Sequence, residues 1–142
     1  MNRTAYSLIS VFLAVSFALL CAVSVSRQSL QSIVLVRMKT QELKTFYLAE
    51  SGLEHGKNLI VSNNSWFTEN APVTDSKNRL LTASSGEIYL FGQGGYKIIR
   101  EKGKNCLYSI GFIGTDIIKS PAFSFQRIDF ELPFKTVKWE EF

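Results

Sequence analysis

The chain has 142 residues, 46% of them hydrophobic, and a formal net charge of +4. Its basic residues are spread along the chain, which argues against the basic stripe with interleaved aromatic residues that binds nucleic acids. There are two cysteines, and Cys21 lies in an uncharged segment far from Cys106. This excludes a disulfide framework, and we expect Cys106 to be a small buried residue.

The first predicted element is a helix that crosses a membrane. No charged residue occurs from Thr4 to Ser26, and a bilayer core needs about 20 apolar residues of helix. The segment is longer than the apolar core of a typical signal peptide. It contains many Ala and Ser residues, which favour close packing against other helices in lipid. An ordinary signal anchor with incidental small residues is the alternative.

The same helix is expected to continue well beyond the membrane. There is no Pro or Gly from Arg27 to Ser51, and Asn63 and Asn64 provide a plausible end because Asn tolerates the left-handed conformation. Apolar residues recur at helical spacing and predict one packing face. This predicted helix stripe consists of Val36, Leu43, Phe46, Leu53 and Ile60.

A polar connection is expected to follow at residues 63–86, which are rich in Asn, Ser, Thr and charged residues. Within it, we expect Trp66 and Phe67 to attach the connection to the folded domain. An exposed adhesive pair of aromatic residues is the sharper alternative.

The rest of the chain is predicted to form an antiparallel sheet. Residues Cys106, Tyr108, Ile110 and Phe112 share one face of a strand, and we expect the helix to cover this single apolar face. In the next strand the apolar phase changes between Phe125 and Ile128, which predicts a bulge or two separate pairings. The predicted strands are Glu87–Phe91, Tyr96–Glu101, Cys106–Ile113, Ala122–Leu132 and Phe134–Glu140.

The predicted fold class is therefore α+β, with a long N-terminal helix packed on a small antiparallel sheet. The expected parts are a leader at 1–5, the membrane half of the helix at 6–26, its exposed amphipathic half at 27–62, the connection at 63–86 and the sheet domain at 87–142.

No set of residues predicts catalysis. The only histidine, His55, lies beside Glu54 without a nucleophile, and we expect it to be an exposed helix residue. The glycine-rich segment at 92–95 leads into a strand and reads as a turn, because a phosphate-binding loop would lead into a helix. Asp75 and Asp116 lack the spacing of a calcium loop. We therefore expect no enzyme activity, no metal and no cofactor.

The N-terminal residues carry a family resemblance. The segment from Ala5 to Val11, AYSLISV, resembles the start of type IV pilins and pseudopilins. The resemblance implies that a prepilin peptidase cuts between Ala5 and Tyr6 and that the new amine of Tyr6 is methylated. It also implies the pilin-like layout of a long helix, a polar connection and a small sheet.

A second segment resembles PilX-like minor pilins. Residues 46–54 read FYLAESGLE, and the match lies in the helix motif Ala49, Glu50, Ser51 and Gly52. The family glutamate at the fifth mature position is replaced by Ser10. A carboxylate in the bilayer makes membrane insertion less favourable by about 2.5–3.5 kcal/mol. The resemblance implies that the family keeps this glutamate because it forms an ion pair with the N-terminal amine of the neighbouring subunit ahead.

Because Ser10 cannot form that ion pair, we expect a minor subunit at the tip or at the start of a filament. A second departure concerns orientation. Only Arg3 precedes the uncharged segment, whereas Arg27, Arg37 and Lys39 follow it. This charge bias favours a cytoplasmic C-terminal part, whereas the resemblance implies that this part lies outside.

The expected function is that of a minor pilin or pseudopilin in a type IV pilus or a type II secretion-like filament. The implied partners are other pilins or pseudopilins, the prepilin peptidase, the inner-membrane assembly platform and the membrane, without nucleic acid. The implied location is the inner membrane as a single-pass protein and then an extracytoplasmic filament. The alternative is a single-pass membrane-anchored extracytoplasmic binding module that is neither processed nor polymerised.

Overall fold

The structure is a computed structural model that describes residues 3–69, 80–81, 86–132 and 135–141. Helix α1 (Arg3–Ser62) is the first element. The chain divides into two compact units, Met1–Lys39 and Thr40–Phe142, and α1 contributes to both. The helix lacks Pro throughout and Gly before Gly52, so nothing in its sequence interrupts the backbone bonds over its first turns.

The chain leaves α1 at Asn63, where the sequence predicts the end, but not through the predicted left-handed conformation, because no described residue other than glycine has a positive φ. The Asn63 N–H donates to Leu59 O at 2.9 Å, which extends the helical pattern by one residue. The Asn63 side chain then accepts a bond from the Ser65 N–H at 3.0 Å. Such an Asx turn offers the backbone a non-helical partner, and the chain leaves the helix here.

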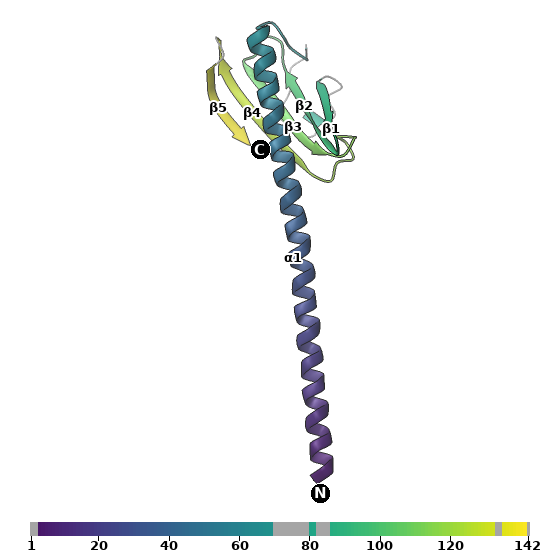
Figure 1. The fold of residues 1–142 in the computed structure, drawn as a ribbon. Helices are drawn as coiled ribbons and strands as arrows, with labels where there is room; N and C mark the ends of the chain where they lie inside the picture. Colours follow the sequence, from purple (N-terminus) through teal and green to yellow (C-terminus); the bar gives the residue numbers. More distant parts are fainter. Residues whose placement is uncertain (1–2, 70–79, 82–85, 133–134, 142) are drawn as a thin grey trace. The chain divides into compact units, whose positions relative to one another are not determined.

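A five-stranded antiparallel meander follows, with neighbouring strands adjacent in sequence (Figure 1). This arrangement confirms the predicted α+β fold of a long helix and a small antiparallel sheet. Phe134, the predicted start of the last strand, lies outside the part of the chain that the structure describes. The strands are β1 (Glu87–Phe91), β2 (Gly94–Arg100), β3 (Cys106–Ile113), β4 (Phe123–Glu131) and β5 (Lys135–Glu141).

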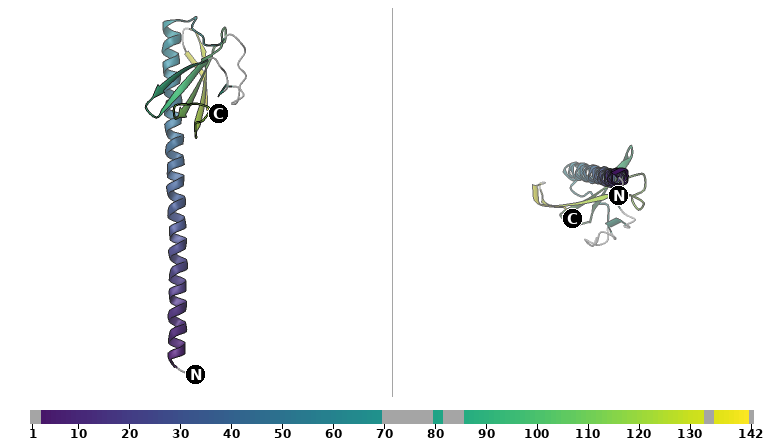
Figure 2. Two further views of the ribbon diagram at one scale, coloured as in Figure 1. Left: turned by 90° about the vertical axis from the view of Figure 1, so that its right-hand side faces the viewer. Right: turned by 90° about the horizontal axis from the view of Figure 1, so that it is seen from below.

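Two hydrophobic cores lie on opposite faces of this sheet. One lies between the sheet and the C-terminal part of α1, which runs along one face in Figure 2. It contains Leu53, Ile60, Leu107, Ile128 and Phe130. The other lies on the opposite face and contains Leu80, Ile99, Cys106, Tyr108, Ile110, Phe112, Ile117 and Phe125.

The predicted position of the helix is therefore wrong in one respect. The apolar residues Tyr108, Ile110 and Phe112 do share a face, but α1 covers the opposite face, which carries Leu107, Ser109 and Gly111. Small side chains allow the helix backbone to approach the strand closely, whereas large ones hold it away. The apolar face is covered instead by segments that include Leu80 and Ile117.

The predicted irregularity in β4 has a different cause. Pairing between β3 and β4 runs without interruption from Cys106↔Asp129 to Phe112↔Phe123, so no bulge separates Phe125 from Ile128. The apolar phase changes because Phe125 belongs to one core and Ile128 to the other. A register shift does occur, but between β4 and β5 at Asp129/Phe130.

Candidate assembly surfaces

The part of α1 in the first unit presents an unusually apolar surface. Its most hydropathic 18-residue window has a mean hydropathy of 2.6, and none of that window is buried within the chain. Phe12 and Phe17, for example, are 71% and 70% exposed. Contiguous apolar surface of this size is rare on soluble monomers and marks contact with protein or lipid. By length and composition, this one helix can cross a membrane.

The residues expected at the processing site lie at the beginning of this helix. Ala5 and Tyr6 belong to α1, but their side chains fall outside the described structure, as do Met1 and Asn2 entirely. Ser10 lies on the helix with its side chain exposed. The first carboxylate of the sequence is Glu42, so no acidic side chain lies within the apolar surface.

In the second unit, α1 contacts the sheet through small residues. Thr45 and Ala49 are 1% and 0% exposed and lie against β3. A Cβ at Gly111 would lie 2.0 Å from Thr45 O and 2.6 Å from Ala49 N, and one at Gly52 would lie 2.2 Å from Ser109 Oγ. We call this contact the helix–sheet seam; it comprises Thr45, Ala49, Gly52, Gly56, Ser109 and Gly111.

The family-like motif has two sides in this seam. Ala49 and Gly52 are buried and face the sheet, whereas Glu50 and Ser51 are exposed. Ser51 Oγ donates to Tyr47 O at 2.8 Å, one turn back along the helix. The spacing of the motif therefore places its two small residues on the side where the backbone of β3 comes closest.

The predicted helix stripe divides into buried and exposed members. Leu53 and Ile60 are 2% and 0% exposed and belong to the core beneath α1. Phe46 is partly buried, with its ring centroid 6.4 Å from that of Trp139 on β5. Leu43 and Val36 are 50% and 65% exposed. The structure thus brings the C-terminal members together and leaves the N-terminal ones on the surface.

Sequence reasoning missed Thr45, Gly56 and Gly111 as contact residues. A search for regularly spaced apolar residues does not find them, because they contribute to the contact by having small side chains or none. The available signal was Gly111, a glycine inside an otherwise apolar strand, which often marks close approach of another backbone.

The seam also contains a polar contact. Gln126 is fully buried on β4, and its Nε2 donates to Phe46 O of α1 at 3.3 Å. Its Oε1 and the Ser109 Oγ have no partner among the residues described. Buried polar groups without partners destabilise a fold, so apolar packing must outweigh them here.

His55 differs from its expected place on the exposed surface. It is half-buried in a row of aromatic rings on the β1–β2 side. Its Nδ1 lies 2.9 Å from the Tyr96 hydroxyl, and its ring meets Tyr89 edge-on at 4.5 Å. Tyr89 in turn donates to the Glu87 carboxylate, and this bond, with burial, raises the pKa of Tyr89 to about 12. His55 therefore has a packing role in this row.

The connection after α1 is attached to the domain partly as predicted. Trp66 packs against the core beneath the helix. Phe67 is more exposed, at 36%, and Lys102 Nζ lies 5.2 Å from the centre of its ring. The Thr68 N–H donates to Arg100 O at 2.9 Å. Asp75 lies outside the described residues.

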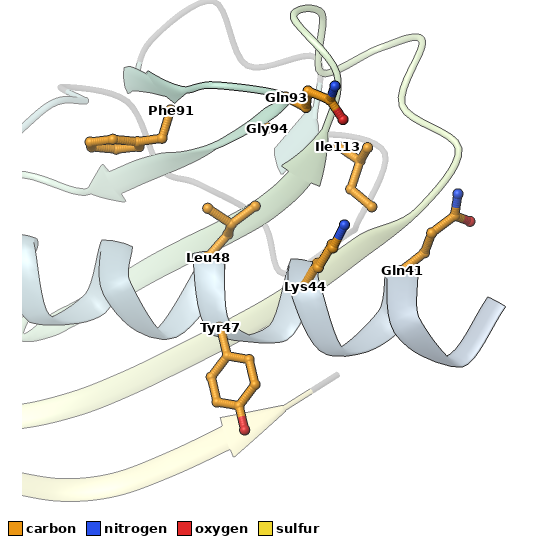
Figure 3. Close-up of a pocket in the computed structure, with 8 residues that line it drawn as sticks. All are labelled: Gln41, Lys44, Tyr47, Leu48, Phe91, Gln93, Gly94 and Ile113. Atoms are coloured by element: carbon orange, nitrogen blue, oxygen red, sulfur yellow. The ribbon is translucent and has the colours of Figure 1, made fainter. Parts of the chain in front are cut away.

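A hollow of about 460 Å³ lies between α1 and the β1–β2 turn (Figure 3). Lys44 and Leu48 point toward it from α1, whereas the Tyr47 ring points away in this view. Phe91, Gln93 and Ile113 complete much of its lining. One cation, amides and apolar groups provide no paired acid and base, and no group of three metal-ligating side chains occurs within the described chain.

Comparisons of the chain with protein-family models, with curated proteins and with solved structures found no match.

Proposed function

We propose that this protein is a minor pilin or pseudopilin, a structural subunit that takes part in assembling a type IV pilus or a type II secretion-like filament. The observation that carries the proposal is the exposed, uncharged helix surface in the first unit. In the second unit the same helix is fixed to a sheet through a seam of small residues. A helix apolar enough for lipid and also suited to packing against other helices fits a subunit that moves from membrane to filament.

In this proposal the chain first waits in the inner membrane with α1 in the bilayer. A prepilin peptidase cuts between Ala5 and Tyr6, the Tyr6 amine is methylated, and an assembly platform brings α1 against the helices of other pilins. Close packing of α1 against neighbouring helices drives the assembly, because lipid contacts are exchanged for helix contacts and lipid is as apolar as the helix surface. The protein makes and breaks no bonds itself.

Ser10 supports placement at the tip or at the start of the filament. A subunit in the shaft needs a partner for the amine of the next subunit, and Ser10 provides no negative charge for it. The copy number of the protein in purified filaments tests this placement. We expect few copies per filament; a chain that proves to be the most abundant subunit contradicts a tip position.

The mass of the mature protein tests the class itself. We expect a chain that begins at Tyr6 and carries one methyl group, purified together with other pilins. Replacing Ala5 with Leu should block the cut, because the leaders of this family end in a small residue, whereas Asn2→Leu should leave it unchanged. A chain that keeps Met1 in cells that process other prepilins would contradict the proposal.

A membrane-anchored binding module is the second candidate. The hollow in Figure 3 favours a domain that presents a ligand site of its own. This candidate predicts an unprocessed N-terminus and no filament. A reporter fused to the C-terminus separates the orientations: activity only in the cytoplasm contradicts both extracytoplasmic candidates.

A further inference from the structure

A second hollow, of about 380 Å³, lies where the connection after α1 passes the β2–β3 turn. Two cationic side chains, Arg100 and Lys102, contribute to its lining, together with the aromatic residues Trp66 and Phe67 and the amide of Asn105. No carboxylate is among its described lining residues. The hollow therefore combines positive charge with a flat apolar wall.

Arg100 is held in place as a buried cation. Its side chain lies over the Phe130 ring at 5.3 Å, and the residue is 5% exposed. Nη1 donates to Trp66 O at 2.6 Å and to Asn64 O at 3.1 Å, whereas Nε has no partner within the described residues. Burial lowers the pKa of Arg100, and the acceptors of its side-chain hydrogen bonds in the described part of the chain are neutral carbonyl oxygens.

A buried guanidinium without a counter-charge is unfavourable, because its transfer from water is only partly compensated by neutral carbonyls. Arginine is suited to planar acid groups, since its donors match the oxygens of carboxylates and phosphates. Lys102 adds a second positive charge beside the Phe67 ring. Both residues line the hollow, so an acid group that enters it would be attracted by both charges.

We propose that this hollow binds a small organic anion whose carboxylate or phosphate group lies against Arg100 and Lys102 and whose flat apolar body packs on Phe67. The inference goes beyond filament assembly, because a single chain forms the hollow. It gives the second unit a ligand site on the connection between helix and sheet.

Binding is tested on the full-length chain in micelles of an uncharged maltoside detergent, which does not compete for the cations. Calorimetric titrations with benzoate and with phenyl phosphate distinguish the two acid groups. Benzyl alcohol keeps the aromatic ring but lacks the negative charge, and acetate keeps the charge but lacks the ring. We expect saturable binding of benzoate, phenyl phosphate or both, at least tenfold weaker binding of benzyl alcohol, and weaker binding of acetate than of benzoate.

Variants of exposed residues locate the site without disturbing the core. Lys102→Gln should weaken anion binding about two- to fivefold, the effect of removing one exposed charge pair. Phe67→Ala should abolish the advantage of benzoate over acetate. Lys119→Gln, at a position exposed far from this hollow in the sequence, serves as the control and should change nothing.

The proposal is overturned if neither aromatic acid binds at concentrations up to about 20 mM, which corresponds to less than about 2.3 kcal/mol of binding free energy. It is also overturned if benzyl alcohol binds as well as benzoate, or if Lys102→Gln binds as tightly as the unchanged chain. Unfolding curves of each variant establish that a loss of binding comes from the site. None of these readouts depends on filament formation or on N-terminal processing.

Discussion

Gly111 is the residue on which the contact between helix and sheet depends most directly. A methyl group there would meet Thr45 O at 2.0 Å and Ala49 N at 2.6 Å. Both are main-chain atoms of α1, so no side-chain rotation relieves the overlap. The backbones of α1 and β3 approach closely because Gly111 has only a hydrogen atom on the face that α1 contacts.

Gly111→Ala should therefore lower the free energy of unfolding of the second unit by about 1–3 kcal/mol, the range for overpacking a tight contact. Denaturant unfolding followed by the fluorescence of Trp66 and Trp139 measures the change. Ser51→Ala is the control, because Ser51 is exposed on the outer side of the same helix. A loss below 0.5 kcal/mol for Gly111→Ala would mean that the seam is looser than described.

Tyr89 provides a test by pH. Its bond to the Glu87 carboxylate raises its pKa to about 12, from an ordinary value of 10.0. The folded state thus holds the phenolic proton more tightly than the unfolded state, so this contribution to stability is complete below pH 10 and is lost as the pH rises from 10 to 12. Absorbance titration at alkaline pH should show late ionisation of Tyr89 and also of Tyr96, whose pKa is raised by burial, and Glu87→Gln should shift the Tyr89 pKa toward the ordinary value.

At the scale of elements, the C-terminal part of α1 has one side in the core and another side in solvent. Leu53 and Leu43 are the same residue type on the same helix, yet they are 2% and 50% exposed. Leu53 packs in the core with Leu107 and Ile128, whereas half of the Leu43 surface stays exposed for other contacts. A substitution at Leu53 therefore tests folding, whereas a substitution at Leu43 tests contacts with other subunits.

Leu53→Ala should destabilise the second unit by about 2–5 kcal/mol, since it removes buried methyl groups and leaves a cavity. Leu43→Ala should change stability by less than about 0.5 kcal/mol. Thermal unfolding of both variants measures the difference. In the proposed filament, Leu43→Ala should also reduce incorporation, an effect that counting the subunits per filament would detect. Equal destabilisation by the two variants would contradict the placement of the helix.

The sequence predicts the elements of this fold better than the contacts between them. Strand positions follow from local alternation and turn residues, so the bounds of β3, Cys106–Ile113, agree with the prediction. The sequence did not predict which face of the sheet α1 covers, because an apolar face can be covered by a helix or by other segments. Small residues such as Gly111 decide this through close approach, and their effect depends on a partner distant in the sequence.

The candidate surfaces were accessible to sequence reasoning to different degrees. The apolar helix surface needs only a run of uncharged residues, so it could be predicted in full. The hollow beside Arg100 could not, because it combines the connection after α1 with the β2–β3 turn. Nothing local in the sequence places Trp66 O 2.6 Å from Arg100 Nη1.

At the scale of the whole molecule, the two units have different requirements. The first, Met1–Lys39, exposes apolar side chains and needs a membrane or other helices around it. The second, Thr40–Phe142, buries its own cores on both faces of the sheet. Substitutions should therefore separate membrane retention from domain stability.

Val15→Lys and Val61→Lys form a matched pair for this test, because both valines are exposed on α1, at 53% and 66%. Val15 lies within the uncharged segment, where a lysine makes membrane insertion less favourable by about 3 kcal/mol. Val15→Lys should lower the share of protein that resists alkaline extraction from membranes and should leave the unfolding midpoint of the second unit unchanged. Val61→Lys should alter neither quantity, since its position lies at the other end of the helix.

If Val15→Lys shifted the unfolding midpoint as much as Leu53→Ala, the two units would not be independent. If it left extraction unchanged, the apolar surface would not be the membrane anchor.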